Sequence, residues 1–153
     1  MDQTYFEDIA LGTRIRSARR TITEADIVMF SGLSGDFGAL HNDRVFIEQE
    51  TDFKAPIAAG LHIASVVTGL RSELDSWVVT AFLECRRKFK APVYAGDTIS
   101  FEYEVTEARP RKSRADSGVV QYDVRVYNQD GELVQEGEDV VLVATRAGAA
   151  SRA

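Results

Sequence analysis

The second half of the chain alternates apolar and polar residues over long stretches. In "ISFEYEV" and in "VQYDVRVY" every second residue is apolar. The runs "WVVTAFLECRRKFK" and "ELVQEGEDVVLVA" have the composition of further strands, and the turn sequences "YAGD" and "NQDGE" lie between such runs. A period of two places one side of each strand in the core and the other side in water. This half of the chain therefore predicts a long antiparallel meander.

The first half of the chain begins with a weak strand signal and then shows helical spacing. "GTRIRSARRTIT" is rich in β-branched and basic residues and predicts a first strand. In "TEADIVMFSGL", Thr23 followed by Asp26 resembles a capping box, which predicts a short helix over about 24–33. Asp43 is placed to cap a second short helix through "RVFIEQE".

The stretch "LHIASVVTGLRSELD" is apolar on nearly all sides until Arg71. A helix of that kind is normally buried. The apolar face of the predicted sheet must be covered, and this segment, beginning near Leu61, is the candidate. The sequence thus predicts an α+β fold in which an antiparallel sheet wraps around a long central helix.

Length and composition are those of a globular protein. A chain of 153 residues with 44% hydrophobic and 27% charged residues fits one domain, which we expect over 1–146, with a frayed tail at 147–153. The net charge of −6 argues against nucleic acid as a partner. The acidic start predicts no signal peptide, and no run reaches the ~18 apolar residues of a membrane span.

Cys85 is the only cysteine, so an internal disulfide is ruled out and a reducing, cytoplasmic setting fits. It lies in a strand-like run, where a packed structural thiol is favoured over a nucleophile. With one cysteine and two histidines, we expect no metal site.

The candidate chemistry lies in "SGDFGALHND", which holds Asp36 and His41 among glycines. Near neutral pH an aspartate is ionised and a histidine is mostly neutral, so together they can hold and deprotonate a water molecule. Gly35 and Gly38 allow the sharp turns that would bring the two side chains together. The alternative is that Asp36 closes a turn and His41 is a satisfied interface histidine.

An electrophilic partner is also available at Gly60, the expected start of the buried helix. Helix N-termini present unpaired N–H groups and a partial positive charge. Directed at a carbonyl oxygen, such an N–H stabilises a developing enolate, and a glycine allows close approach to the backbone.

Three segments resemble one known family. "SGDFGALHND" is similar to the (R)-specific enoyl-CoA hydratase signature of the MaoC-like dehydratases, Ser-Gly/Glu-Asp-x-Asn-Pro-Leu-His-x-Asp. "FKAPIAAGLHIASVVTGL" resembles the family's Pro-Ile-Ala-His-Gly-Met segment and the helix after it. "RRKFKAPVYAGDTISFEYEV" resembles its Phe-x-x-Pro-Val-x-x-Gly-Asp strand. The segments occur in the family order and cover roughly 22–143.

The resemblance implies a hotdog fold, homodimers or larger homo-oligomers, and hydration of a trans-2-enoyl-CoA to an (R)-3-hydroxyacyl-CoA without a further cofactor. It makes Asp36 and His41 the catalytic pair and Gly60 the backbone donor to the thioester carbonyl. Their neighbours Phe37 and Leu61 are then expected to contact the substrate.

Four positions qualify this assignment. Gly38 and Ala39 stand where the family has Asn and Pro, so the loop lacks a side-chain amide that helps to shape it. Ala59 replaces the histidine before the carbonyl-binding glycine. His62, two residues after that glycine, is interpreted as packing or lining the pocket rather than as catalytic.

Coenzyme A carries phosphates, which favour a basic patch near the pocket. Arg86, Lys88 and Lys90 fall on one side of a strand, and "RPRKSR" (109–114) forms a basic loop. Either would attract phosphates, and either is equally well a solvated face. Two other functions stay open: a hotdog thioesterase in which an acid activates water against the thioester carbonyl, and a non-catalytic acyl-CoA-binding module.

Overall fold

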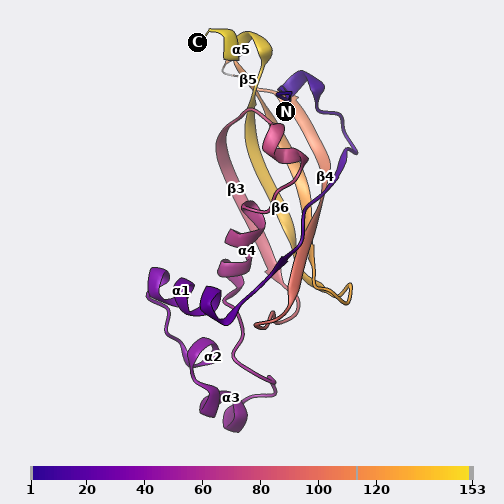
Figure 1. Ribbon diagram of the computed structural model, residues 1–153. Helices are drawn as coiled ribbons and strands as arrows, with labels where there is room; N and C mark the ends of the chain where they lie inside the picture. Colours follow the sequence, from indigo (N-terminus) through magenta and orange to yellow (C-terminus); the bar gives the residue numbers. More distant parts are fainter. Residues whose placement is uncertain (1, 113, 152–153) are drawn as a thin grey trace.

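The computed structural model describes residues 2–112 and 114–151, and an antiparallel sheet forms its largest element (Figure 1). Within that part of the chain the sheet has six strands, in the order β1-β4-β5-β6-β3, with β2 also paired to β4. The strands are β1 (Arg14–Arg16), β2 (Arg20–Thr21), β3 (Val79–Phe89), β4 (Thr98–Pro110), β5 (Ser117–Tyr127) and β6 (Leu133–Ala144).

The predicted alternation is confirmed in β4 and β5. Their inward residues are buried and their outward residues are partly exposed. The register aligns Tyr103 with Val124 and Phe101 with Val126, so apolar side chains of neighbouring strands form continuous rows. Burying a Val, Ile or Phe side chain contributes about 1.5–3 kcal/mol, and these rows supply much of the core.

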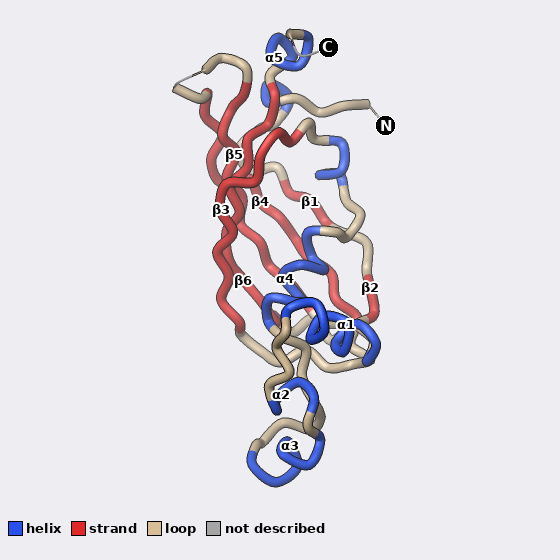
Figure 2. The backbone as a smooth tube through the Cα atoms, turned by 90° about the vertical axis from the view of Figure 1, so that its left-hand side faces the viewer, coloured by secondary structure: helices blue, strands red, loops and turns tan. Residues whose placement is uncertain are grey.

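The helices are short and cover one face and one end of the sheet. They are α1 (Glu24–Ser34), α2 (Ala39–Asn42), α3 (Arg44–Glu50), α4 (Gly60–Thr68) and α5 (Arg146–Ala150), with 3-10 turns η1 (Phe6–Asp8) and η2 (Glu73–Ser76). Helix α4 lies against the sheet, while α1, α2 and α3 gather at one end and both termini lie at the other (Figures 1 and 2).

Local signals set the helix starts as expected. The Thr23 hydroxyl caps α1 by accepting from the Asp26 N–H, and the Asp26 carboxylate accepts from the Thr23 N–H, which confirms the capping box. Asp43 caps α3 by accepting from the Phe46 N–H at 2.9 Å. The short helix α2 between them was not predicted.

The central helix is shorter than predicted. It ends at Thr68 rather than continuing to Asp75. Ser72 accepts a hydrogen bond from the Leu74 N–H, and Asp75 accepts one from the Ser72 N–H, so these side chains start a separate 3-10 turn. Serine and aspartate compete with the helix for backbone groups in this way, and the apolar pattern alone did not reveal it.

Two further expectations need correction. Residues 147–150, expected to fray, belong to α5, which Thr145 caps through the Gly148 N–H, whereas 152–153 lie outside the described residues. Cys85, expected to be packed, is exposed, because β3 is an edge strand with only β6 beside it in the described sheet. Partial desolvation of its sulfur still raises the thiol pKa, which disfavours a nucleophilic role.

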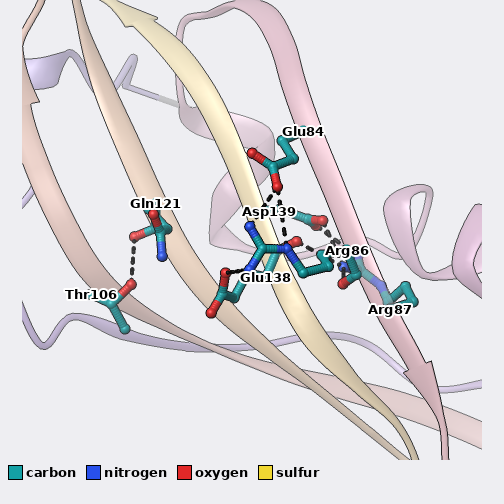
Figure 3. A network of polar contacts seen from close by, with 7 residues as sticks. All are labelled: Glu84, Arg86, Arg87, Thr106, Gln121, Glu138 and Asp139. Carbon is teal, nitrogen blue, oxygen red and sulfur yellow. Dashed lines mark hydrogen bonds and ion pairs between the residues drawn. The ribbon is translucent and has the colours of Figure 1, made fainter.

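A buried ion pair joins β3 to β6. Arg87 donates to both carboxylate oxygens of Asp139, at 2.7 and 2.8 Å, and the two side chains are 3% and 0% exposed (Figure 3). Both charges are therefore satisfied by each other inside the protein. The pair fixes the edge strand on the sheet, while Arg87 Nε has no hydrogen-bond partner among the described residues.

Candidate active site

His41 is held in one orientation by the segment that leads into α4. Its Nδ1 lies 2.7 Å from the Ile57 carbonyl oxygen, and the Ile57 N–H donates to the Leu40 carbonyl at 3.0 Å. A carbonyl can only accept, so Nδ1 carries the hydrogen, and in the neutral ring Nε2 has the free lone pair. The side chain is 15% exposed. The connector thus presents His41 as a hydrogen-bond acceptor.

Asp36 is held by a tight turn. One of its carboxylate oxygens, Oδ1, accepts from the Gly38 N–H at 3.0 Å, and the Asp36 N–H donates to the Ser34 hydroxyl at 3.2 Å. Gly35, at φ +76°, ends α1 in the left-handed conformation and turns the chain into this loop. The second oxygen, Oδ2, is left to face His41.

The pair is open rather than closed. Asp36 Oδ2 lies 3.7 Å from His41 Nε2, too far for a direct hydrogen bond, and the Asp36 side chain is 56% exposed. Two acceptors that face each other at this distance suit a small molecule with two O–H donors, such as water. The predicted proximity of Asp36 and His41 is therefore present in the fold.

His41 lines a cavity of ≈370 Å³ beside the N-terminus of α4. Its walls are mainly apolar and include Gly60, the first residue of the helix, whose N–H has no acceptor within the helix. Packing also requires a glycine at position 60, because a Cβ there would lie 2.6–2.9 Å from ring atoms of Phe89. The histidine and the helix N-terminus thus line the same cavity.

A second cavity of ≈390 Å³ also includes His41. It has a more polar wall, with Asn42, Arg44 and Lys54 among its residues. The Lys54 ammonium lies 4.3 Å from the centre of the Tyr94 ring. His41 is therefore shared by a mainly apolar cavity and a partly basic one.

Comparison with known proteins places this chain in a family. The model of the MaoC like domain matches residues 8–128. The chain is 32% identical to the (R)-specific enoyl-CoA hydratase of Aeromonas caviae, over 88% of this chain and 96% of the relative. It is 34% identical to the (R)-specific enoyl-CoA hydratase of Rhodospirillum rubrum, over 93% of each.

The chain belongs to the MaoC-like domain family.

A solved structure supports the fold of this MaoC-like domain. A Mycobacterium tuberculosis protein described as having a double hotdog fold superposes with a TM-score of 0.79 at 20% identity, over 94% of this chain and 44% of that one. The antiparallel sheet with α4 against one face is thus a hotdog fold, and the predicted α+β class is confirmed.

Other predicted site residues of the MaoC-like domain lie apart from the cavity. Phe37 and Leu61 are 63% and 66% exposed, and neither lines the cavity at Gly60. Their expected contact with substrate stays a prediction.

The structure divides the three basic residues Arg86, Lys88 and Lys90, of which the first two lie on β3 and the third follows it. Lys90 lines the His41 cavity and pairs with Glu136 at 3.4 Å. Arg86 and Lys88 line a separate hollow of ≈310 Å³. There Arg86 is paired with Glu84 and Glu138, at 2.7 and 3.1 Å (Figure 3).

The basic loop 109–114 lies far from the pair. Arg109 and Pro110 end β4, and the residues after them lead to β5 at the end of the sheet opposite α1–α3 (Figure 2); position 113 lies outside the described residues. Within one chain it does not reach the His41 cavity.

His62 packs in the interior, one of the two roles interpreted from the sequence. It is 5% exposed and stacks on Phe30 of α1, with ring centres 4.9 Å apart. Burial lowers its pKa, the nearby Asp26 carboxylate raises it, and Arg20 lowers it.

Two contributors were missed by the sequence reasoning. Ile57 acts through its backbone carbonyl, for which no side-chain signal exists. Gln135 is buried on β6, lines the cavity and donates to the Gly60 carbonyl at 2.8 Å. A polar residue at an inward position of a predicted strand is a signal that was available.

The described residues contain no group of three or more His, Cys, Asp or Glu side chains arranged to hold a metal ion. In the same residues, no helix has the length and apolar character needed to cross a membrane.

Proposed function

We propose that this MaoC-like domain adds water to a trans-2-enoyl-CoA thioester to give an (R)-3-hydroxyacyl-CoA, and that it catalyses the reverse dehydration. The observation that carries the proposal is the open pair, in which two acceptors, His41 Nε2 and Asp36 Oδ2, face each other at 3.7 Å. The relatives named (R)-specific enoyl-CoA hydratase support the substrate class and the configuration.

The enzyme class rests on broader ground. A further relative, 30% identical over 72% of this chain, is the 3-hydroxybutyryl-CoA dehydratase of Methylorubrum extorquens. Hydration and dehydration are the two directions of one hydro-lyase reaction. The protein is a hydro-lyase of the MaoC-like family.

The pair has a direct chemical role in this reaction. A water molecule between His41 and Asp36 donates one O–H to each and directs an oxygen lone pair at C3 of the substrate. The oxygen bonds to C3, one water proton passes to the pair, and the pair returns a proton to C2, so that H and OH are added in total. General acid–base catalysis of this kind contributes about 10²–10⁴-fold.

Gly60 completes the proposed site. As electrons move toward the thioester oxygen, negative charge develops there, and the Gly60 N–H stabilises it together with the positive end of α4. The mainly apolar walls of the cavity suit the acyl part of the substrate. For the phosphates of coenzyme A, Lys90 is better placed than Arg86, because it lines this cavity.

We also propose that the working form is a homodimer paired through β3. Among the described strands, β3 lies at the edge of the sheet and pairs only with β6 (Figure 1). It exposes Val79, Phe82, Leu83 and Phe89. An edge strand of eleven residues with free backbone groups and apolar side chains needs a cover, and an identical strand fits it.

The dimer has its own test. Light scattering after gel filtration is expected to give twice the chain mass, and Leu83→Lys is expected to lower it. If the wild-type protein stays monomeric at micromolar concentration, the dimer proposal is wrong, and the hydratase proposal is unaffected.

One assay tests the activity and separates the alternatives. A short enoyl-CoA is added to the protein, and loss of the conjugated enoyl-thioester absorbance is followed together with release of free thiol. Loss without thiol supports hydration, and an (R)-specific coupling enzyme identifies the configuration. Thiol release indicates a thioesterase. Absence of both signals, with acyl-CoA still bound, indicates a binding module.

A further inference from the structure

Gln135 has an unusual position in the cavity of His41. It lies on β6, is 2% exposed and lines the cavity together with Gly60 and Phe89. Its Nε2 donates to the Gly60 carbonyl oxygen at 2.8 Å. The side chain is thus tied to the first turn of α4.

The other end of the same amide is unsatisfied. Gln135 Oε1 is buried and has no hydrogen-bond partner among the described residues. A flipped amide would place oxygen against the Gly60 carbonyl, so the bond from Nε2 fixes which end is the acceptor. Buried polar atoms nearly always have a partner, and an unpaired acceptor in this position is costly.

No donor of the cavity wall is bonded to this oxygen. Most of the cavity's other walls are apolar or aromatic: Phe53, Ile57, Ile63, Phe89, Pro92 and Val93. Of the two other polar side chains in the lining, His41 uses Nδ1 on the Ile57 carbonyl and Lys90 pairs with Glu136.

We propose that Gln135 determines specificity by accepting a hydrogen bond from an N–H or O–H donor of the bound substrate. The inference rests on the proposed function, in which an acyl-CoA thioester occupies this cavity. The thioester group has no donor of its own. Close to the thioester, such a substrate supplies one in two places: an amide N–H of the pantetheine arm, or a hydroxyl on the acyl chain.

The test measures binding of saturated thioesters, which cannot be hydrated, by calorimetry. S-ethyl thiobutyrate and the butyryl thioester of N-acetylcysteamine differ by an amide, whereas butyryl-CoA and 4-hydroxybutyryl-CoA differ by a hydroxyl. The proteins are the wild type, Gln135→Met, which keeps the size without the amide, and Gln121→Met as the matched control. Gln121 lies on β5 and is not part of the cavity wall.

In the wild type and in Gln121→Met, the donor-bearing member of one pair is expected to bind about three- to tenfold more tightly, as one neutral hydrogen bond predicts. In Gln135→Met that ratio is expected to fall to about one. If the affinity ratio of the pair that differs by an amide falls to one, the donor belongs to pantetheine. If the affinity ratio of the pair that differs by a hydroxyl falls to one, the donor belongs to the acyl chain.

Three results would overturn the proposal: no preference in the wild type for either donor, a preference that survives in Gln135→Met, or an equal loss of affinity for all four ligands. The last outcome would mean that Gln135 acts only by holding Gly60. If Gln135→Met fails to fold, the wild-type ratios alone still decide the first point. Hydration is measured separately on the same wild-type sample, so failure of the hydratase proposal is distinguishable from failure of this one.

Discussion

The two histidines of this chain occupy opposite situations. His41 keeps one nitrogen on the Ile57 carbonyl and turns the other, Nε2, toward Asp36 at the edge of a cavity. His62 is buried against Phe30, and its Nδ1 has no hydrogen-bond partner in the described part of the chain. One ring is oriented with a lone pair left available, and the other fills space.

The comparison shows that the role of a histidine follows from the contacts of its two nitrogens rather than from burial. Both rings are largely shielded from water, and both lie near a carboxylate. At His41 the surrounding backbone selects one tautomer, which is what a proton acceptor needs. At His62 desolvation lowers the pKa and favours the neutral ring.

Removing the oriented ring should have the largest effect. His41→Ala is expected to lower kcat for hydration of a short enoyl-CoA by about 10²–10⁴-fold, because the water loses its acceptor. His62→Leu serves as the comparison and is expected to keep most of the activity. Wild-type rates in His41→Ala, with the fold intact by circular dichroism, would contradict the assignment.

The other half of the pair should follow closely. Asp36→Asn keeps the shape of the side chain and removes its charge, so we expect a loss of about 10²-fold or more in kcat with little change in stability, since the side chain is half exposed. Steady-state rates and a urea unfolding curve check the two parts separately. A loss confined to KM would mean that Asp36 binds substrate and takes no part in proton transfer.

The sequence predicted the parts of this site that depend on side-chain type and local order. Alternation in β4 and β5 gave the sheet, and "SGDFGALHND" gave Asp36 and His41. It could not give the contact between His41 and the Ile57 carbonyl, because a backbone acceptor leaves no trace in residue identity. Nor did it give the early end of α4, where the side chains of Ser72 and Asp75 compete with an apolar pattern.

The packing histidine should affect stability instead of activity. His62→Ala removes the ring that stacks on Phe30 and is expected to lower the free energy of unfolding by about 1–3 kcal/mol. His62→Leu fills most of the same volume and removes the unpaired nitrogen, so its stability should be close to that of the wild type. Urea unfolding of both variants measures these free energies. An equal loss of stability in His62→Ala and His62→Leu would show that the ring makes a polar contact.

The turn that holds Asp36 can be tested by a smaller change. A Cβ on Gly38 would lie 3.0 Å from Asp36 Oδ1, so Gly38→Ala must displace the carboxylate slightly. We expect kcat to fall by about three- to tenfold, which corresponds to a lost hydrogen bond of ordinary strength. Gly32→Ala makes the same substitution where nothing lies within 4 Å of the new carbon, and it should leave kcat unchanged.

The smallest expected effect is the pH dependence of stability from His62. Its pKa is lowered in the fold, mainly by desolvation, whereas in the unfolded chain it returns to about 6.5. Below pH 6.5 the unfolded state therefore binds more protons than the folded state. As the pH is lowered through this range, the free energy of unfolding decreases by at most about 1.4 kcal/mol per pH unit. Above pH 6.5 the ring is neutral in both states and stability no longer depends on it.

Two charged groups, Asp26 and Arg20, act on the ring of His62. Hydrogen bonds from Thr23 lower the pKa of Asp26 from its ordinary 3.8, so its own loss of charge falls below this window. Between pH 8 and 5 the free energy of unfolding of the wild type should thus fall more than that of His62→Leu, which has no ring to protonate. Because His41→Ala retains His62, its stability should decline with pH as the wild type does in this respect. Parallel curves for the wild type and His62→Leu would show that His62 binds protons equally in the folded and unfolded states, and the contrast between the two histidines would then rest on the geometry of His41 alone.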